Sequence, residues 1–225
     1  MSLMPLYIIA HLKRIIHPFQ TWIWIKMRIE ESTFWHQHVI DAEYQWLVDK
    51  CRPNTTLIDI GAYEGDTPMF FSLFHNIVNI IAFEPDKTHY KRAKQLLFHE
   101  SKNPHVNKVT LYNEAVGKDH TFDDNIMYLN PKDHENIRCI SLNDALRLTT
   151  TSAIVIKCDC EGGEYEIFTQ EAKFRNVYAI QLEYHRGPKQ IPEILKDKGF
   201  KIMLEPSKPS PASDKSELGY IYAWR

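Results

Sequence analysis

The sequence lacks several features that would place it in a familiar class at once. It has no basic excess, because 27 Lys and Arg residues stand against 29 Asp and Glu residues and the net charge is −2. A surface that holds the backbone of a nucleic acid needs such an excess, so we expect no nucleic-acid partner. No apolar run approaches the roughly 18 residues that would span a bilayer.

Cysteines are also few, and none of the four forms a C-x-x-C pair. A chain of 225 residues can bury enough apolar surface to fold without disulfides, and we see no signal peptide. We therefore expect a reducing, cytoplasmic compartment. Cys158 and Cys160 lie one residue apart in an apolar run, a placement more typical of buried strand residues than of zinc ligands.

The first 29 residues contain no acidic side chain, and four basic residues give them a charge of +4. Apolar residues from Ile8 to Phe19 recur on one helical face, which predicts an amphipathic helix packed on the main domain or on a second subunit. Trp22 and Trp24 suggest the alternative of weak contact with an anionic membrane surface, peripheral to the bilayer. We divide the chain into a basic amphipathic extension, residues 1–33, and one domain, residues 34–225.

After a helix-like stretch at Phe34–Val48, short apolar runs alternate with helical stretches. The predicted strands are Thr56–Ile60, Asn79–Phe83, Val109–Tyr112, Ala153–Ile156 and Val177–Leu182. The predicted helices are Pro68–His75, Lys87–His99, Leu142–Leu148 and Glu164–Phe174. Strands that are apolar on both faces and alternate with helices indicate an α/β fold, in which helices cover both faces of a mostly parallel sheet.

The carboxyl-terminal part follows a different pattern. After a helix at Ile191–Lys198, the strands Phe200–Leu204 and Gly219–Trp224 are joined by a Pro/Ser-rich loop that contains no helix. A parallel pair needs a crossover connection, so these two strands should pair antiparallel. Phe122–Leu129 and Ile137–Ile140 resemble a small hairpin inserted after the third strand.

A glycine-containing loop and a later acid predict a nucleoside-binding site. The first predicted strand ends at Asp59–Ile60 and leads into a loop that contains Gly61 and Gly65, before a helix with Pro68 in its first turn. Glu84 ends the next strand, where a carboxylate can accept hydrogen bonds from both hydroxyls of a ribose. Asp86 fits better as the cap of the helix that begins at Lys87.

The same loop favours S-adenosylmethionine over a dinucleotide. Dinucleotide loops read G-x-G-x-x-G, but here Tyr63 stands at the position of the second glycine. Asp59, Glu64 and Asp66 would repel a pyrophosphate and would suit the sulfonium and ammonium of S-adenosylmethionine. An NAD(P)-dependent oxidoreductase and a non-catalytic module that binds S-adenosylmethionine remain as alternatives.

Charged side chains also follow the fourth and fifth predicted strands. Lys157, Asp159 and Glu161 alternate along the sequence, which would place them on one side of an extended chain. Glu183 and His185 alternate in the same way after the fifth strand. Charges inside parallel strands are costly unless they line a site, and ligands bind at the carboxyl ends of such strands. A Lys157–Glu183 ion pair that only braces the sheet is the structural alternative.

At this point the sequence resembles the FkbM-type methyltransferases, which have a Rossmann-like fold and depend on S-adenosylmethionine. The resemblance runs from about Thr56 to His185, and Cys158, Cys160 and Gly163 depart mildly from its pattern. It is carried by six blocks in order, namely Asp59–Asp66, Phe83–Asp86, Asn113–Gly117, Ser141–Leu146, Lys157–Glu164 and Glu183–His185. It implies methyl transfer to a hydroxyl, often on a sugar, glycan or other small natural product.

We therefore expect the following site. Candidate cofactor-binding residues are Asp59, Gly61, Ala62, Tyr63, Gly65, Glu84, Pro85, Glu114, Asp159 and Glu161, with Glu114 near the adenine. Candidate catalytic residues are His185, Asp159, Glu183 and Lys157. His185 is the first choice of base, because an unperturbed histidine titrates near the working pH. Asp159 is the second choice, and with Glu161 and Glu183 it could instead hold a divalent cation, although metal-free transfer is the expectation.

Overall fold

The computed structural model describes residues 44–100, 104–118, 137–206 and 218–225. The predicted extension at residues 1–33, most of the helix predicted at 34–48 and the strand predicted at 122–129 lie outside these ranges. Within them, no helix has the length and apolar character needed to cross a bilayer.

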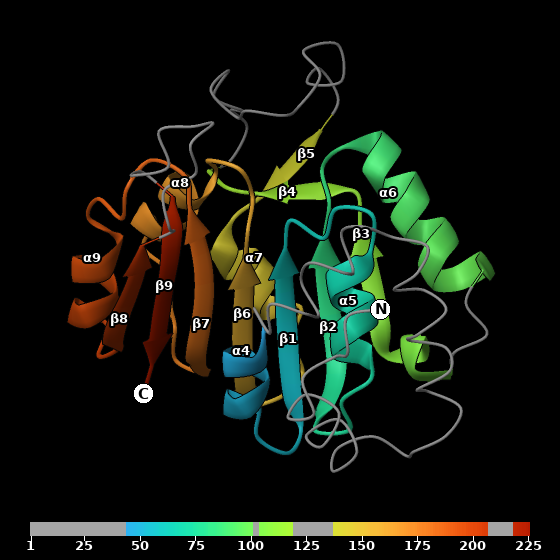
Figure 1. Cartoon of the computed structure of the whole chain (residues 1–225), viewed down its shortest axis with the longest axis horizontal. Helices are drawn as coiled ribbons and strands as arrows, with labels where there is room; N and C mark the ends of the chain where they lie inside the picture. The colour runs from blue at the N-terminus through green and yellow to red at the C-terminus, as the bar shows by residue number, and fades with distance from the viewer. Residues whose placement is uncertain (1–43, 101–103, 119–136, 207–217) are drawn as a thin grey trace, which may run out of the picture.

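Seven strands form the main sheet in the order β3-β2-β1-β6-β7-β9-β8 (Figure 1). Strand β9 runs antiparallel to the other six strands, which all share one direction, so the predicted sheet with an antiparallel C-terminal strand is confirmed. The strands are β1 (Thr55–Ile60), β2 (Ile77–Phe83), β3 (Val109–Tyr112), β6 (Ala153–Cys158), β7 (Val177–Tyr184), β8 (Lys201–Pro206) and β9 (Gly219–Trp224).

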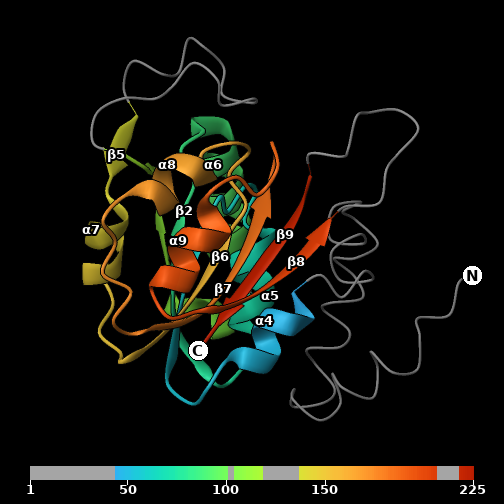
Figure 2. The same cartoon turned by 90° about the vertical axis from the view of Figure 1, so that its left-hand side faces the viewer.

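Helices cover both faces of this sheet, with α4 and α5 on one face and α7, α8 and α9 on the other (Figure 2). They are α4 (Gln45–Lys50), α5 (Asp66–Ser72), α6 (Lys87–Lys94), α7 (Leu142–Arg147), α8 (Glu164–Thr169) and α9 (Ile191–Asp197). A π-helical turn, η1 (Gln95–Glu100), continues α6, and a 3₁₀ turn, η2 (Pro104–Lys108), precedes β3.

The two layers of core explain why the central strands are apolar at successive positions. Ile58 and Ile156 point into the core under α7–α9, whereas Leu57 and Val155 point into the core under α4 and α5. All four side chains are fully buried. Since neighbouring residues of a strand face opposite ways, burial on both faces requires an unbroken apolar run.

The ends of two helices show which local signals were informative. Asp86 caps α6, because its side chain accepts the backbone N–H groups of Thr88 at 2.7 Å and His89 at 2.8 Å, as predicted. Helix α8 ends at Thr169 instead of the predicted Phe174. Gln170 is extended, with ψ of 158°, and the segment that follows it packs its own aromatic ring into the core.

The predicted hairpin at 122–140 needs correction. Residues 138–140 form β5 (Arg138–Ile140), which pairs in parallel with β4 (Glu114–Val116), a strand that was not predicted. The two form a small separate sheet above the carboxyl end of the main one (Figure 1). A three-residue strand carries too few positions for an alternation of apolar residues to identify it.

Candidate active site

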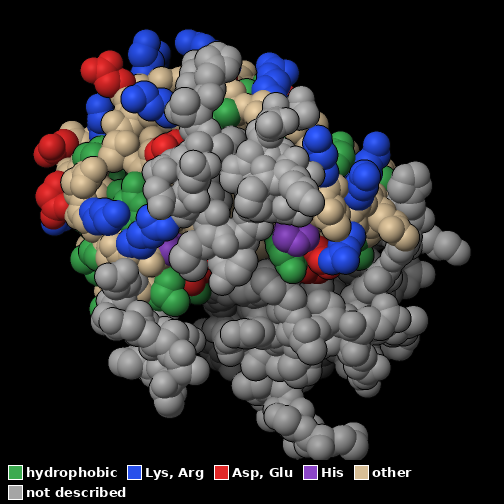
Figure 3. Space-filling view, turned by 90° about the horizontal axis from the view of Figure 1, so that it is seen from above, with side chains coloured by type: hydrophobic (Ala, Val, Ile, Leu, Met, Phe, Trp, Pro, Cys, Tyr) green, Lys and Arg blue, Asp and Glu red, His purple; other side chains and the backbone are tan. Residues whose placement is uncertain are grey.

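A cavity of about 610 Å³ opens where the carboxyl ends of β2, β1 and β6 meet. Strand β1 leads to β2 and β3 on one side, and the chain returns to β6 and β7 on the other, so the cavity lies where the strand order reverses. Open α/β sheets bind ligands at this point. Figure 3 looks onto this edge of the sheet, where histidine and acidic side chains are visible next to Lys and Arg side chains.

The loop after β1 needs its glycines for packing of the chain against itself. Gly61 has a φ of +82°, and a Cβ there would lie 1.7 Å from the carbonyl oxygen of Asp159. Gly65 has a φ of +95°, and a Cβ there would contact Ala93 of α6. Of the candidate cofactor-binding residues in this loop, Gly61 and Ala62 line the cavity, whereas Gly65 is not among its lining residues. Close packing of the chain against itself therefore accounts for both glycines.

Glu84 lies at the end of β2 with its carboxylate held by backbone groups. Oε2 accepts the N–H of Tyr63 at 2.7 Å, and Oε1 accepts the N–H of Asp86 at 2.8 Å. The residue is only 5% exposed but lines the cavity. Burial raises the pKa of Glu84 to about 7, although the two backbone hydrogen bonds oppose that effect. Each oxygen keeps a lone pair that a ligand hydroxyl can use.

Other residues at this end of the cavity were only partly anticipated. Pro85 and Glu114 line the cavity as expected, and Glu114 forms an ion pair with Arg138 at 3.1 Å. Asn113 was not predicted as a site residue, yet its Nδ2 donates to the carbonyl oxygens of Glu84 at 2.9 Å and Pro85 at 3.0 Å. Tyr63 and His89 also line the cavity, and their ring centroids lie 4.2 Å apart.

Asp59 and Lys157 form a buried ion pair between neighbouring strands, with Nζ and Oδ1 3.2 Å apart. Lys157 also donates to the carbonyl oxygen of Gly61 at 2.6 Å, and Asp59 accepts the hydroxyl of Thr67 at 2.6 Å. Burial lowers the pKa of Lys157, but the Asp59 and Asp159 carboxylates outweigh it and hold the pKa above its ordinary value. Asp59 is fully buried and, unlike Lys157, does not line the cavity. The structural alternative considered for Lys157 thus named the wrong partner, because Asp59, and not Glu183, pairs with it.

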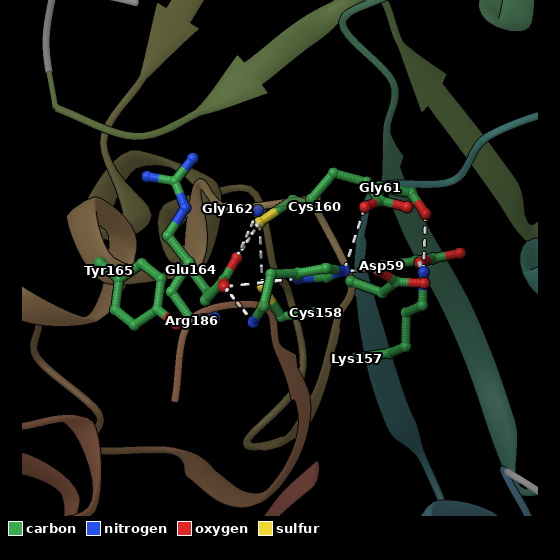
Figure 4. A network of polar contacts seen from close by, with 12 residues as sticks. Asp59, Gly61, Lys157, Cys158, Cys160, Gly162, Glu164, Tyr165 and Arg186 are labelled. Atoms are coloured by element: carbon green, nitrogen blue, oxygen red, sulfur yellow. Dashed lines mark hydrogen bonds and ion pairs between the residues drawn. The ribbon is translucent and has the colours of Figure 1, made fainter. Parts of the chain in front are cut away.

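His185 lies in a cluster of carboxylates at the other end of the cavity. Figure 4 shows one of these carboxylates, that of Glu164, with its polar contacts. Its Nε2 is 3.1 Å from Oε2 of Glu161 and 3.9 Å from Oδ1 of Asp159, and its Nδ1 is 3.4 Å from Oε1 of Glu164. Burial lowers the pKa of His185, but hydrogen bonding to Glu161 and Glu164 and the nearby negative charges raise it to about 11. In this arrangement the ring is charged at neutral pH, so the reason given for choosing it as the base, an unperturbed pKa, does not hold.

The end of β6 also departs from the extended row that was predicted. The strand ends at Cys158, and Glu161 takes a left-handed conformation with a φ of +54°. That turn directs Glu161 to His185, together with Asp159, whereas Lys157 is bound to Asp59. Glu183 is not among the residues that line the cavity.

Glu164 was missed as a site residue. It is fully buried, and its carboxylate accepts the N–H of His185 at 2.9 Å and the N–H of Gly162 at 2.8 Å. In the sequence it is an acidic residue in the first turn of a helix, a common position that does not mark a site. The pairing with His185, 21 residues later, is visible only in three dimensions.

The charge of the cavity fits a cationic cofactor. Among the described residues, five carboxylates line it, those of Glu84, Asp86, Glu114, Asp159 and Glu161. Lys157 and His89 are the basic lining residues, and Lys157 is already paired with Asp59. The three loop acids on which the sequence argument relied do not contribute, since Asp59 is buried, Glu64 pairs with Arg92 and Asp66 is not a lining residue. The cavity still favours a sulfonium over a pyrophosphate, but because of the five lining carboxylates and not because of the three loop acids.

Comparison with solved structures finds the same fold. A methyltransferase FkbM from Methylobacillus flagellatus KT aligns with a TM-score of 0.51 and 15% identity over 84% of this chain and 52% of that protein, so the chain spans about half of its length. The METTL16 MTase domain aligns with a TM-score of 0.51 and 12% identity over 84% of this chain and 66% of that one. A precorrin-6y C5,15-methyltransferase from Geobacter metallireducens GS-15 aligns more weakly, with a TM-score of 0.47 and 17% identity over 78% of this chain and 84% of that one. No curated protein matches the sequence significantly.

The family is shown by a direct match of the sequence. The model of the methyltransferase FkbM domain matches residues 59–202, which is well over half of the chain and includes every residue that lines the cavity, from Ile60 to Gly163. S-adenosylmethionine is therefore the expected cofactor, in agreement with the acidic lining of the cavity. The chain belongs to the FkbM methyltransferase family.

Proposed function

We propose that this protein transfers a methyl group from S-adenosylmethionine to a hydroxyl oxygen of a small acceptor, such as a sugar, a glycan or another natural product. The observation that carries the proposal is the division of one cavity into two acidic ends. Glu84 stands at one end, and Asp159 and Glu161 stand at the other, beside His185. The first end suits a ribose, and the second suits a positively charged methyl donor and a hydroxyl that must lose its proton.

S-adenosylmethionine, when bound, supplies an electrophilic methyl group. The protein contributes position and the exclusion of water. Glu84 accepts hydrogen bonds from the ribose hydroxyls, and the backbone N–H groups of Tyr63 and Asp86 hold its carboxylate in place. Lys157 ties the loop at Gly61 to the buried Asp59, which fixes the wall between the two ends.

A carboxylate next to His185 acts as the base that removes the acceptor's proton. The imidazolium lies within 4 Å of both Asp159 and Glu161, and these two side chains line the cavity. A carboxylate that accepts a hydrogen bond from the attacking hydroxyl raises the electron density on its oxygen as the methyl group transfers. Asp159, with a side chain 21% exposed, is the better placed of the two for a stable orientation, because Glu161 is 44% exposed.

The acidic lining of the cavity disfavours two other functions, binding of a nicotinamide cofactor and methylation of a nucleic acid. The pyrophosphate of a nicotinamide cofactor and the phosphates of a nucleic acid would both approach five carboxylates, at an electrostatic cost. A neutral, hydroxyl-bearing acceptor carries no such cost. This argument supports the small-molecule acceptor and leaves its identity to experiment.

The test begins with calorimetric titration of the protein with S-adenosylmethionine, S-adenosylhomocysteine and NAD⁺, of which only the first two should bind. Methyl-tritiated S-adenosylmethionine is then offered with a panel of sugars, glycans, other small hydroxyl compounds and an RNA. Label should enter a hydroxyl compound, and Asp159→Asn should lower that turnover by about 100-fold, the effect expected of a lost general base, while S-adenosylhomocysteine still binds. Binding of NAD⁺, transfer to RNA alone, or cofactor binding without any transfer would contradict the proposal.

A further inference from the structure

The cluster around His185 has the composition and spacing of a metal site. Oδ1 of Asp159, Oε2 of Glu161 and Nε2 of His185 all lie within 4.8 Å of one another. One imidazole and two carboxylates from two different loops point at a common centre next to the cavity, and both carboxylates line it. This differs from the cation site considered from the sequence, because His185 takes the place of Glu183.

The orientation of the histidine ring is a second observation in favour of a metal. The side chain of His185 is only 6% exposed, and its Nε2 faces the two carboxylates. Behind it, Glu164 lies 3.4 Å from Nδ1 and also accepts the backbone N–H of His185. Histidines that bind metals almost always present the other ring nitrogen to a carboxylate or a carbonyl, which fixes the tautomer and the orientation of the ring.

The net charge of the cluster around His185 also favours a bound metal ion. Three carboxylates, those of Asp159, Glu161 and Glu164, surround a single histidine. Even a charged ring leaves this group with a net negative charge, in a partly buried place where charges are costly unless they are paired or coordinate a metal. A divalent ion would neutralise it.

We propose that Asp159, Glu161 and His185 bind one divalent metal ion, and that Glu164 is a positioning residue that orients the histidine. Carboxylates favour Mg²⁺ and Mn²⁺ and an imidazole favours first-row transition metals, so Mn²⁺ satisfies the whole set best. Binding releases the Nε2 proton to solvent, because only the neutral ring donates an electron pair to a metal.

This inference rests on the proposed function and narrows its acceptor. Asp159 would then act on the acceptor hydroxyl through the bound ion and not as a free carboxylate. Three protein ligands leave open positions on an ion that prefers six. An acceptor hydroxyl oxygen bound at one of them becomes more acidic, and a neighbouring oxygen of the same molecule can take a second. The acceptor class is therefore a compound with two adjacent oxygen donors, such as a vicinal diol or a hydroxy acid.

The test measures metal binding without any methyl transfer. Chelator-treated protein is titrated with MnCl₂, and free Mn²⁺ is followed by electron paramagnetic resonance. We expect one ion per chain, a loss of affinity of at least tenfold in Asp159→Asn and His185→Gln, and a 10- to 100-fold loss in Glu164→Gln. Glu193→Gln removes an equal charge from an exposed position on α9, where the side chain is 66% exposed, and should bind Mn²⁺ like the parent.

S-adenosylhomocysteine, titrated in parallel by calorimetry, separates the outcomes and shows that each variant is folded. Mn²⁺ and S-adenosylhomocysteine that bind together support the inference. Absence of Mn²⁺ binding, or Mn²⁺ binding that is unchanged in the Asp159 and His185 variants, overturns it and leaves the proposed function intact. Competition between the two ligands also overturns it, since the cluster would then hold the ammonium of the cofactor. Failure of S-adenosylhomocysteine to bind the parent protein overturns the proposed function instead.

Discussion

Glu164 contacts His185 twice, through the ring at 3.4 Å and through the backbone N–H at 2.9 Å. The two residues begin α8 and follow β7, so this contact joins the two elements that carry the acidic end of the cavity. The buried carboxylate therefore has a structural role that a stability measurement can detect.

Replacement of Glu164 by Ala should destabilise the fold. It leaves the N–H groups of Gly162 and His185 without their acceptor and removes a buried partner of the charged ring. Loss of one partner of a buried ion pair typically costs several kcal/mol, so we expect the free energy of unfolding to fall by about 3 kcal/mol in urea titrations at pH 7. Glu193→Ala, at an exposed site, should change it by less than about 0.5 kcal/mol. Equal effects of the two substitutions would rule out the structural role.

Cofactor affinity should depend on pH through Glu84, whose pKa is about 7 in the free protein. The ionised carboxylate accepts hydrogen bonds from ribose hydroxyls, whereas the protonated form has lost part of that capacity. Below its pKa only a fraction of the protein has the ionised form, so affinity for S-adenosylhomocysteine should fall about tenfold from pH 8 to pH 6. Glu84→Gln should bind more weakly with a flat profile in calorimetry. If the variant keeps the slope of the parent, another group is responsible.

Gly61 and Gly199 allow a matched test of backbone packing, since φ is positive at both, +82° and +86°. A Cβ at position 199 would meet nothing within 4 Å, so Gly199→Ala should cost only the conformational strain of about 1 kcal/mol. A Cβ at position 61 would collide with the carbonyl of Asp159, and we expect Gly61→Ala to cost at least about 3 kcal/mol. Urea unfolding of both variants checks the difference. Similar costs would mean that the carbonyl moves aside freely.

Lys157 and Asp59 should behave as a coupled pair. Lys157→Met leaves a fully buried carboxylate without its cation, and we expect a loss of about 3 kcal/mol. Addition of Asp59→Asn should restore part of that loss, because the amide needs no counter-charge and can still accept the hydroxyl of Thr67. A double-mutant cycle by urea unfolding measures the coupling. Strictly additive losses would show that the two groups do not interact.

Much of the fold could be predicted because the signals are local. The unbroken apolar runs of the central strands follow from burial on both faces, and Asp86 identifies the start of α6 by its capping chemistry. The antiparallel pairing of β8 with β9 was predicted from their connection, since no crossover helix joins them among the described residues. Strand β4 was missed because three residues show no period, and β5 was predicted as a strand but with the wrong partner.

The site could be predicted only in part, since its contacts depend on register and on turns. The partner of Lys157 follows from the alignment of β1 with β6, which places Asp59 beside it and is not visible in either strand alone. Glu161 reaches His185 because the chain turns left-handed after β6, a conformation that the sequence pattern treated as extended. The place of Glu84 at the cavity was predictable because it depends only on the end of a strand, whereas its role toward a ribose stays a prediction.

The cavity has walls from two halves of the chain, and the link between Lys157 and Gly61 joins residues 96 positions apart. Contacts so distant in sequence form late in folding, because the entropy of closing a long loop is lost before the contacts contribute any stabilisation. A ligand that needs both walls finds no binding site until this pairing is complete. It will therefore slow the unfolding of the finished protein without accelerating its folding.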